Sequence, residues 1–298
     1  MTIAVCCVTP EGVIFGADST SSLMVPGGFH YLNHNQKVFE IGDGSTVGAV
    51  TWGMASLGLL SHRTQLAQLA DYVAEQRISG VSAICDIWIE RFWPEYQIAI
   101  ARQMPDLLAL HAKSPHGPTT GAVSSARTQQ EEQTYQQLRM GLFVGFCIGG
   151  HDPSDRLPCA FEIKFDPLTS KPTPSRIVLG DTRCWGVPKV FGRIVKGIDP
   201  EVTQAIVASG KWTGSVADLE GLLSPHQLYL PGLPMRDAID FVHSCISSTI
   251  KTLKFSHLSQ TCGGPIEIAV ITTDRDFRWV RHKEWDAAIK EGYASWKF

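Results

Sequence analysis

The sequence predicts an α+β fold in which two antiparallel sheets pack on each other and helices cover their outer faces. Three observations lead to this prediction. Short apolar runs occur in pairs separated by turn residues, which is typical of β-hairpins and therefore of antiparallel sheets. These runs are too apolar for one face of a strand to lie in water. Along the chain the order is strands, two helices, strands, helices, strands, which supplies helices to cover each sheet.

The first half of the chain contains two predicted hairpins followed by two predicted helices. The expected strands are residues 3–9, 12–18, 37–41 and 46–51, and the expected helices lie near 59–73 and 81–104. Pro10-Glu11-Gly12 forms the turn of the first hairpin. Leu59, Leu66, Leu69 and Val73 recur at the spacing of one helix face.

The second half begins with a hairpin, continues with helices and closes with two strands. The expected strands are 142–148, 159–165, 266–272 and 277–280, and the expected helices lie near 188–196, 201–209, 215–223 and 235–255. In the last helix, apolar residues from Ile239 to Leu253 form an unbroken stripe, which indicates that one side of this helix is buried.

All of these elements are expected to form one domain over residues 1–298. Residues 112–128 lack apolar periodicity and are rich in Ser, Thr, Gly and Pro, so a flexible insertion is expected over about 106–140. Residues 282–298 show helical spacing of large side chains such as Trp285 and Tyr293. This C-terminal extension is expected to cover a neighbouring surface.

Composition limits the class of protein and its partners. The 298 residues are 44% hydrophobic and 18% charged, with a formal net charge of −3, as in ordinary soluble globular proteins. That charge gives no argument for nucleic acid or a membrane surface as a partner. The longest apolar runs are far shorter than the roughly 20 residues of a membrane span.

The cysteines and histidines are scattered along the chain. None of the eight cysteines forms a Cys-x-x-Cys pair, and the ten histidines show no paired metal spacing. No signal peptide is visible in the sequence, because no basic region precedes the first apolar run. We therefore expect a cytoplasmic protein with reduced thiols, no metal and no cofactor.

Thr2 is a candidate nucleophile because of its place at the start of the first strand. If Met1 is removed, Thr2 presents a hydroxyl group and a free α-amine on the same residue. Such a residue carries its own general base, which is an established way to activate a hydroxyl. The reference pKa of an α-amine, about 7.7–8.0, is close to working pH, where a proton acceptor is most effective.

Several segments, in this order, resemble the proteasome β-subunit family of N-terminal nucleophile hydrolases, in a divergent, bacterial-type form. The matching pieces are Thr2, Gly12, Gly16-Ala17-Asp18-Ser19, Lys37-Val38-Phe39-Glu40-Ile41, Gly53 and residues 268–279. The resemblance covers about residues 2–105 and 141–281. It implies a four-layer αββα sandwich, and it implies self-association into a ring or another homo-oligomer.

The resemblance also implies roles for individual residues. Thr2 would be the nucleophile, and the ammonium group of Lys37 would stabilise its alkoxide and keep the α-amine neutral. Asp18 would hold Lys37 charged and oriented. The backbone N–H of Gly53 would donate to the oxyanion, a contribution typically worth about 2.7–4 kcal/mol of barrier.

The sequence departs from the family pattern at three places around the threonine. Where the family has Asp-x-x-Ser-Gly, this chain has Ser259 in the acid's place and Cys262 in the serine's, so that only the glycine remains. Trp185 replaces the serine of a Gly-Ser-Gly segment, and Thr20 replaces an arginine. Ser259 is the candidate for restoring polar support to the site.

Three functions remain open at this point. The leading hypothesis is a threonine-type amidohydrolase or peptidase that cleaves a peptide or small amide substrate through an acyl-enzyme on Thr2. The departures at Ser259, Cys262 and Trp185 instead favour a non-catalytic, proteasome-like assembly or binding protein. A third hypothesis is a transpeptidase or small-amide hydrolase that uses the same threonine, because Trp185, Cys262 and the insertion would remodel the pocket.

Overall fold

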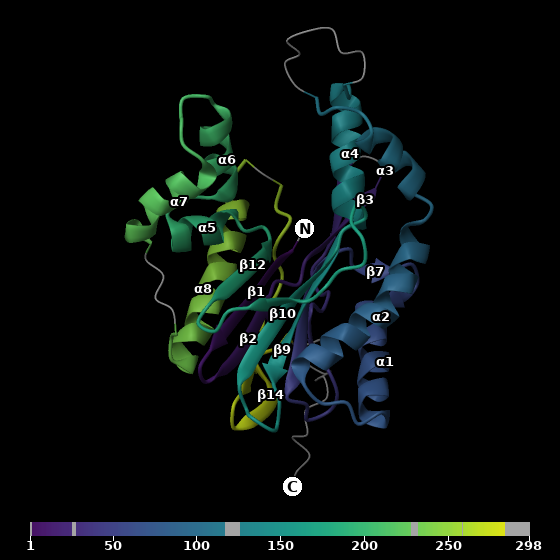
Figure 1. Ribbon diagram of the computed structural model, residues 1–298, viewed down its shortest axis with the longest axis vertical. Helices are drawn as coiled ribbons and strands as arrows, with labels where there is room; N and C mark the ends of the chain where they lie inside the picture. The colour runs from purple at the N-terminus through teal and green to yellow at the C-terminus, as the bar shows by residue number, and fades with distance from the viewer. Residues whose placement is uncertain (1, 26–27, 117–125, 228–231, 258, 284–298) are drawn as a thin grey trace.

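Two five-stranded sheets pack face to face and carry helices on both outer sides (Figure 1). The structure is a computed structural model that describes residues 2–25, 28–116, 126–227, 232–257 and 259–283. One outer layer contains α1 and α2, and the other contains α8 with α5 packed on it. This four-layer αββα arrangement confirms the predicted fold class. All but residues 282 and 283 of the expected C-terminal extension lie outside the described residues.

The first sheet brings together the beginning and the end of the chain. Its strands run in the order β12-β1-β2-β13-β14, and all neighbours are antiparallel. The bounds are β1 (Ile3–Thr9), β2 (Gly12–Ala17), β12 (Thr182–Gly186), β13 (Glu267–Thr272) and β14 (Arg275–Arg281). The central pairing of β2 with β13 joins elements more than two hundred residues apart in sequence.

The second sheet contains strands from the middle of the chain. Its order is β11-β10-β9-β6-β5, again with antiparallel neighbours. The bounds are β5 (Val38–Glu40), β6 (Val47–Gly53), β9 (Val144–His151), β10 (Pro158–Phe165) and β11 (Ser175–Ile177). Two short hairpins lie outside the sheets: β3 (Ser21–Val25) with β4 (Gly28–Leu32), and β7 (Ser56–Leu57) with β8 (Leu60–Ser61).

The helices agree with the predicted positions, with three differences. Their bounds are α1 (His62–Glu75), α2 (Val81–Ile100), α3 (Met104–His111), α4 (Gln129–Leu142), α5 (Lys189–Lys196), α6 (Pro200–Ala208), α7 (Val216–Leu223) and α8 (Met235–Lys254), with a 3₁₀ turn η1 at Ser224–His226. Ser61 caps α1, so Leu59 precedes the helix and is fully exposed instead of lying on its face. The second helix ends at Ile100, and α3 begins separately at Met104.

The third difference concerns the segment 106–140, which was expected to be a flexible insertion. Most of α3 and α4 lies in this segment, and residues 117–125 between them are outside the described residues. Helix α4 begins with a capping box in which Thr128 and Glu131 exchange side-chain and backbone hydrogen bonds. Half of its 14 residues are Gln or Glu, and Tyr135 and Leu142 are its only buried residues, so apolar periodicity gives little signal there.

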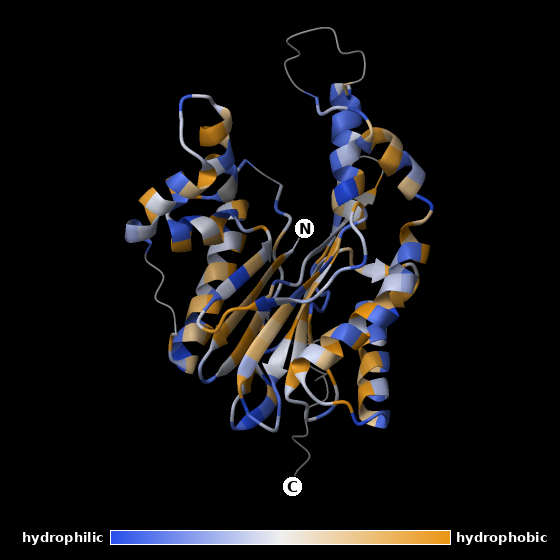
Figure 2. Cartoon of the chain, in the orientation of Figure 1, coloured by the Kyte–Doolittle hydropathy of each residue, from blue (hydrophilic) through white to orange (hydrophobic). Residues whose placement is uncertain are grey.

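Three apolar cores correspond to the three boundaries between layers. One lies between α1, α2 and the second sheet, one between the two sheets, and one between the first sheet and α8. Strand β1 contributes to two of them, because Ala4, Cys6 and Val8 face the other sheet whereas Ile3 and Val5 face α8. Figure 2 accordingly shows the central strands mainly in hydrophobic colours.

The cysteines are free thiols, and most of them are buried in these cores. Burial raises the pKa of Cys7 to about 11 and that of Cys245 to about 12. These thiols therefore stay protonated at neutral pH and act as small apolar side chains.

In the described residues, no helix has both the length and the apolar character that spanning a membrane requires.

Close packing of α8 on the first sheet depends on Gly16 in β2. A Cβ at this position would lie 2.6 Å from Val242 Cγ1 and 2.7 Å from Ile246 Cδ1. We expect Gly16→Ala to lower the free energy of unfolding by about 1–3 kcal/mol through overpacking, measured by urea denaturation.

The matched control is Gly141→Ala in α4, where a Cβ would meet no atom within 4 Å. Because alanine favours a helix over glycine, this variant should be unchanged or more stable by up to about 1 kcal/mol. Equal destabilisation of both variants would contradict the close packing of α8 on β2.

Candidate active site

Thr2, Lys37 and Gly53 line one small pocket at the ends of strands from both sheets. Thr2 directly precedes β1 of the first sheet, Lys37 directly precedes β5 of the second, and Gly53 ends β6. Ser21, Thr51 and other residues complete the pocket wall: Asn35, Gln36, Trp52, Met54, Ala55 and His62. Three of the five site residues expected from the sequence are thus brought together here.

Thr2 is held by its neighbour in β12. It is buried, and the alternation of β1 places its side chain on the same face as Ala4, which points between the two sheets. Gly186 pairs with Ile3 and has φ +83°, and a Cβ there would lie 1.7 Å from the carbonyl oxygen of Thr2. Only glycine permits this approach, so β12 fixes the backbone of the candidate nucleophile.

Asp18, the fourth expected residue, lies behind the pocket and is completely buried. Its Oδ1 accepts hydrogen bonds from the backbone N–H of Ile3 at 3.1 Å and from Lys37 Nζ at 2.6 Å. Its Oδ2 accepts from the backbone N–H of Thr20 at 3.2 Å and of Gly263 at 2.9 Å. Four donors satisfy this carboxylate, as burial of a charged group requires.

Lys37 is buried and oriented by two short contacts. Its Nζ donates to Asp18 Oδ1 and to the backbone carbonyl of Thr20, each at 2.6 Å. These bonds use two of the three N–H donors of an ammonium group, so the third is available to a group in the pocket. Thr20, which stands where the family has an arginine, therefore contributes through its backbone carbonyl.

Gly53 has a backbone conformation that residues with a side chain rarely adopt. Its φ is +91°, and a Cβ there would lie 2.4 Å from the carbonyl oxygen of Phe143. The next residue, Met54, donates its N–H to that same carbonyl at 2.8 Å, which holds the strand end against β9. The pocket wall at Gly53 is therefore bare backbone, with no side chain to keep another molecule at a distance.

Ser259, the fifth expected residue, is not part of this pocket. It is exposed in the loop between α8 and β13. Cys262 is completely buried, and burial is the largest cause that raises the pKa of its thiol to about 12. What this loop gives the site is the N–H of Gly263, which binds Asp18. The sequence identified Gly263 as the one residue of the Asp-x-x-Ser-Gly pattern that this chain keeps, but it did not predict the hydrogen bond to Asp18.

Trp185 is buried in the core between the two sheets and does not line the pocket. Its ring stacks on that of Trp52 with centroids 4.3 Å apart and planes 7° apart, and its Nε1 donates to the Glu162 carboxylate. Gly145 leaves room for the Trp52 ring, since a Cβ there would lie 2.2 Å from it. The stack joins β12 of the first sheet to β6 of the second at Trp52, the residue directly before Gly53.

His62, the first residue of α1, is buried and forms a wall of the pocket. Its Nε2 lies 2.7 Å from the carbonyl oxygen of Met54, which can only accept, so Nε2 carries a proton. Its ring packs edge-on against Phe146, with centroids 5.1 Å apart. Burial lowers the pKa of His62, so the ring is neutral at neutral pH.

Among the described residues, no group of His, Cys, Asp and Glu side chains could hold a metal ion.

Comparisons with known proteins support the fold alone. No family model matches the sequence, and no curated protein matches it. Among solved structures, a mutant form of Anbu from Hyphomicrobium sp. strain MC1 is similar with a TM-score of 0.51 and 9% identity, covering 97% of this chain and 90% of its own. Anbu from Yersinia bercovieri, described as an ancestral beta-subunit, is similar with a TM-score of 0.48 and 11% identity. That match covers 94% of this chain and 87% of the Yersinia chain. The first of these likenesses shows that this chain has a proteasome-like fold.

Removing Lys37 should destabilise the protein because it leaves Asp18 buried without its countercharge. We expect Lys37→Met to lower the free energy of unfolding by about 3 kcal/mol or more, measured by urea denaturation. The matched control is Lys171→Met, which removes a lysine from an exposed ion pair with Glu90 and should cost less than about 1 kcal/mol. Similar losses in both variants would contradict the structural role of the buried pair.

His62 should make stability depend on pH. Because burial lowers its pKa in the folded protein, the unfolded chain binds the proton first as the pH falls below about 6.5. The free energy of unfolding should then decrease, with this residue contributing at most about 1.4 kcal/mol per pH unit. His62→Gln should lose that contribution between pH 7 and 5, whereas His257→Gln in the exposed loop after α8 should keep it. An unchanged slope in His62→Gln would contradict a neutral, buried ring.

Proposed function

We propose that this protein is a threonine-type amidohydrolase or peptidase of proteasome-like type, which cleaves an amide bond through an acyl ester on Thr2 after Met1 is removed. One observation carries the proposal. Thr2, Lys37 and Gly53 line a single pocket, and a completely buried Asp18 binds Lys37 there. A nucleophile, a fixed cation and a bare backbone segment are the groups that acyl transfer requires.

In the proposed first step, the hydroxyl oxygen of Thr2 attacks the substrate carbonyl carbon, and its proton passes to the α-amine of the same residue. The ammonium of Lys37 stabilises negative charge on the attacking oxygen, and its position is fixed by Asp18 and Thr20. The N–H of Gly53 is the proposed donor to the oxyanion, typically worth about 2.7–4 kcal/mol of barrier.

Collapse of the tetrahedral intermediate breaks the bond between the carbonyl carbon and the amide nitrogen. The departing amine takes the proton from the α-amine, which leaves an ester on Thr2. Water then attacks this ester, again with the α-amine as base, and the proton returns to the Thr2 oxygen as the acid leaves. Ser259 has no part in the proposed steps, because it is exposed and outside the pocket.

A non-catalytic assembly or binding protein is the second candidate, and one observation favours it. The residues in place of the family's acid and serine supply no ionised group to the α-amine, since Ser259 is exposed and the Cys262 thiol stays protonated. If catalysis occurs, the polar support must come from Asp18 and Lys37. The labelling experiment below decides between the two candidates.

The remaining parts of the proposal concern substrate and assembly. We propose peptides or small amides as substrates, and self-association into a ring or another homo-oligomer in the cytoplasm. A ring needs two different, complementary surfaces on each copy, which the outer helices can supply. Analytical ultracentrifugation would measure the oligomeric state.

A free Thr2 should be detectable by mass spectrometry. We expect the intact mass of the purified protein to lack Met1, and an epoxyketone or β-lactone probe to add one molecule per chain, mapped to Thr2. Such probes react with a hydroxyl nucleophile that an adjacent base activates. Retention of Met1 on every chain would exclude the proposed mechanism.

Matched variants identify the reacting hydroxyl. Thr2→Ser should keep the adduct because it keeps a hydroxyl and an α-amine, and Thr2→Ala should lose it. Ser21→Ala removes another hydroxyl of the same pocket and should still be labelled. A processed but unlabelled protein would instead support the binding-protein candidate.

A further inference from the structure

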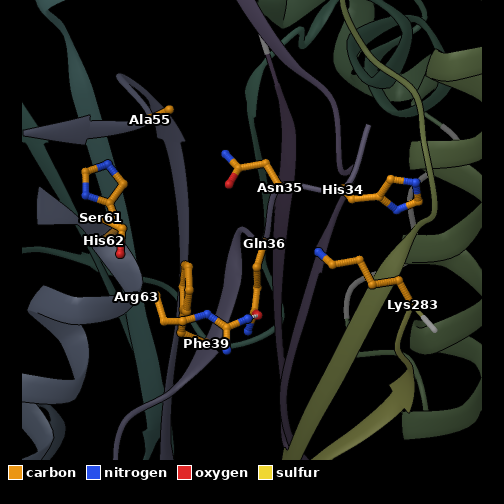
Figure 3. Close-up of a pocket in the computed structure, with 9 residues that line it drawn as sticks. All are labelled: His34, Asn35, Gln36, Phe39, Ala55, Ser61, His62, Arg63 and Lys283. Carbon is orange, nitrogen blue, oxygen red and sulfur yellow. Dashed lines mark hydrogen bonds between the residues drawn. The ribbon is translucent and has the colours of Figure 1, made fainter. Parts of the chain in front are cut away.

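His62 stands in the wall between the Thr2 pocket and a larger cavity. This cavity has a volume of about 430 Å³ and shares Asn35, Gln36, Ala55 and His62 with the pocket. Figure 3 shows Ala55 and the ring of His62 on one side of the cavity, with Asn35 across from them. The shared wall therefore contains a buried imidazole that the proposed reaction steps do not use.

The pairing of β6 shows where the N–H of Gly53 points. Successive N–H groups along a strand are directed to opposite neighbours. The N–H of Thr51 donates to the carbonyl of Lys37 beside β5 at 2.9 Å, so the N–H of Gly53, two residues further on, is directed to the same side. Because β5 begins at Val38, this N–H lies beyond the paired part of β5 and at the pocket that Gly53 lines.

Met54, the next residue, is held at both of its backbone groups. Its N–H donates to the carbonyl of Phe143 at 2.8 Å, and its carbonyl accepts from Nε2 of His62 at 2.7 Å. The first bond ties Met54 to the chain just before β9, and the second ties it to the start of α1. Met54 and Ala55 lie beyond the end of β6. These two bonds therefore hold the chain where the regular sheet pairing stops.

The imidazole of His62 is itself fixed in position. Its ring lies edge-on to Phe146 with centroids 5.1 Å apart, and tilted against Phe92 at 6.0 Å. Its Nδ1 lies 3.3 Å from the side-chain amide of Gln65, which is also buried. The NH₂ group of that amide can donate to Nδ1, which keeps the proton of the neutral ring on Nε2. His62 thus presents a fixed donor to Met54.

We propose that His62 is a positioning residue for the oxyanion donor. Its bond to the Met54 carbonyl holds the end of β6, so that the N–H of Gly53 stays directed at the carbonyl that Thr2 attacks. The inference rests on the proposed function and assigns His62 no contact with the reacting atoms. A preorganised donor acts through its fixed position, so movement of this strand end should slow the chemical step more than it weakens binding.

The first test measures acylation of Thr2 by a β-lactone probe, followed by intact mass over a range of probe concentrations. His62→Met removes the donor at similar volume, whereas in His62→Gln the amide nitrogen stands near the place of Nε2 and still donates to Met54. We expect the limiting rate of acylation to fall by about tenfold or more in His62→Met, with the half-saturating concentration changed by less than about threefold. His62→Gln should recover most of the loss.

Thr9→Val is the matched control. Thr9 is also a buried side chain that donates to a backbone carbonyl, that of Gly12 at 3.2 Å, but it ends β1 at the opposite end from Thr2. This variant should lose stability and keep the rate of acylation. His62→Asn is a second variant without the bond, because its amide nitrogen stands near the place of Nδ1 and does not reach Met54. It should behave like His62→Met.

Hydrogen exchange separates failure of this inference from failure of the proposed function. Mass spectrometry of peptides covering residues 50–57 reports opening of the strand end without any reaction. We expect exchange there to be about tenfold faster or more in His62→Met and His62→Asn, relative to peptides from the middle of β9, and close to wild type in His62→Gln.

Each outcome decides one of the two claims. Faster exchange without labelling of any variant, wild type included, keeps His62 as the residue that holds the strand end and overturns only the proposed function. Unchanged exchange in both His62→Met and His62→Asn overturns the inference, whatever the activity. So does slower acylation that comes only from weaker probe binding, or an equal loss in His62→Gln and His62→Met.

Discussion

The carboxylate of Asp18 is the interaction on which both the fold and the candidate site depend. It is completely buried, and its donors come from Ile3 at the start of β1, Thr20 after β2, Gly263 before β13 and Lys37 before β5. One side chain therefore joins both sheets at the end where the pocket lies. A buried charge is stable only with such a complete set of partners, so the arrangement of these segments is strongly constrained.

The same contacts fix the groups of the candidate site relative to one another. The stack of Trp185 on Trp52 holds the end of β6 just before Gly53, and Asp18 holds Lys37, so the groups of the proposed reaction are in place without rearrangement. Trp185 lies in the core between the sheets and is not part of the pocket lining. The residues of the candidate site thus come from strand ends, and the adjoining cavity is lined in part by residues at the start of α1.

Much of this organisation could be predicted from local patterns. Hairpin turns and apolar runs identified most strands of both sheets, and helical stripes identified the covering helices. The edge strands β11 and β12 were missed because a strand of three to five residues with mixed polarity has no measurable alternation. Helix α4 was missed because half of its residues are Gln or Glu and only two of its residues are buried. Ser259 was expected near Thr2, but the loop turns the N–H of Gly263 inward and leaves Ser259 in solvent.

The sequence by itself determined the layered α+β fold, because hairpin turns and periodicity are local. Its resemblance to the proteasome β-subunit family indicated that Thr2, Asp18, Lys37 and Gly53 belong together. Only the tertiary structure decided what surrounds these residues. Arg63 and Lys283, far apart in the chain, meet at one cavity because α1 and the end of β14 converge there. Such a meeting depends on packing between layers, and no local pattern of residues encodes it.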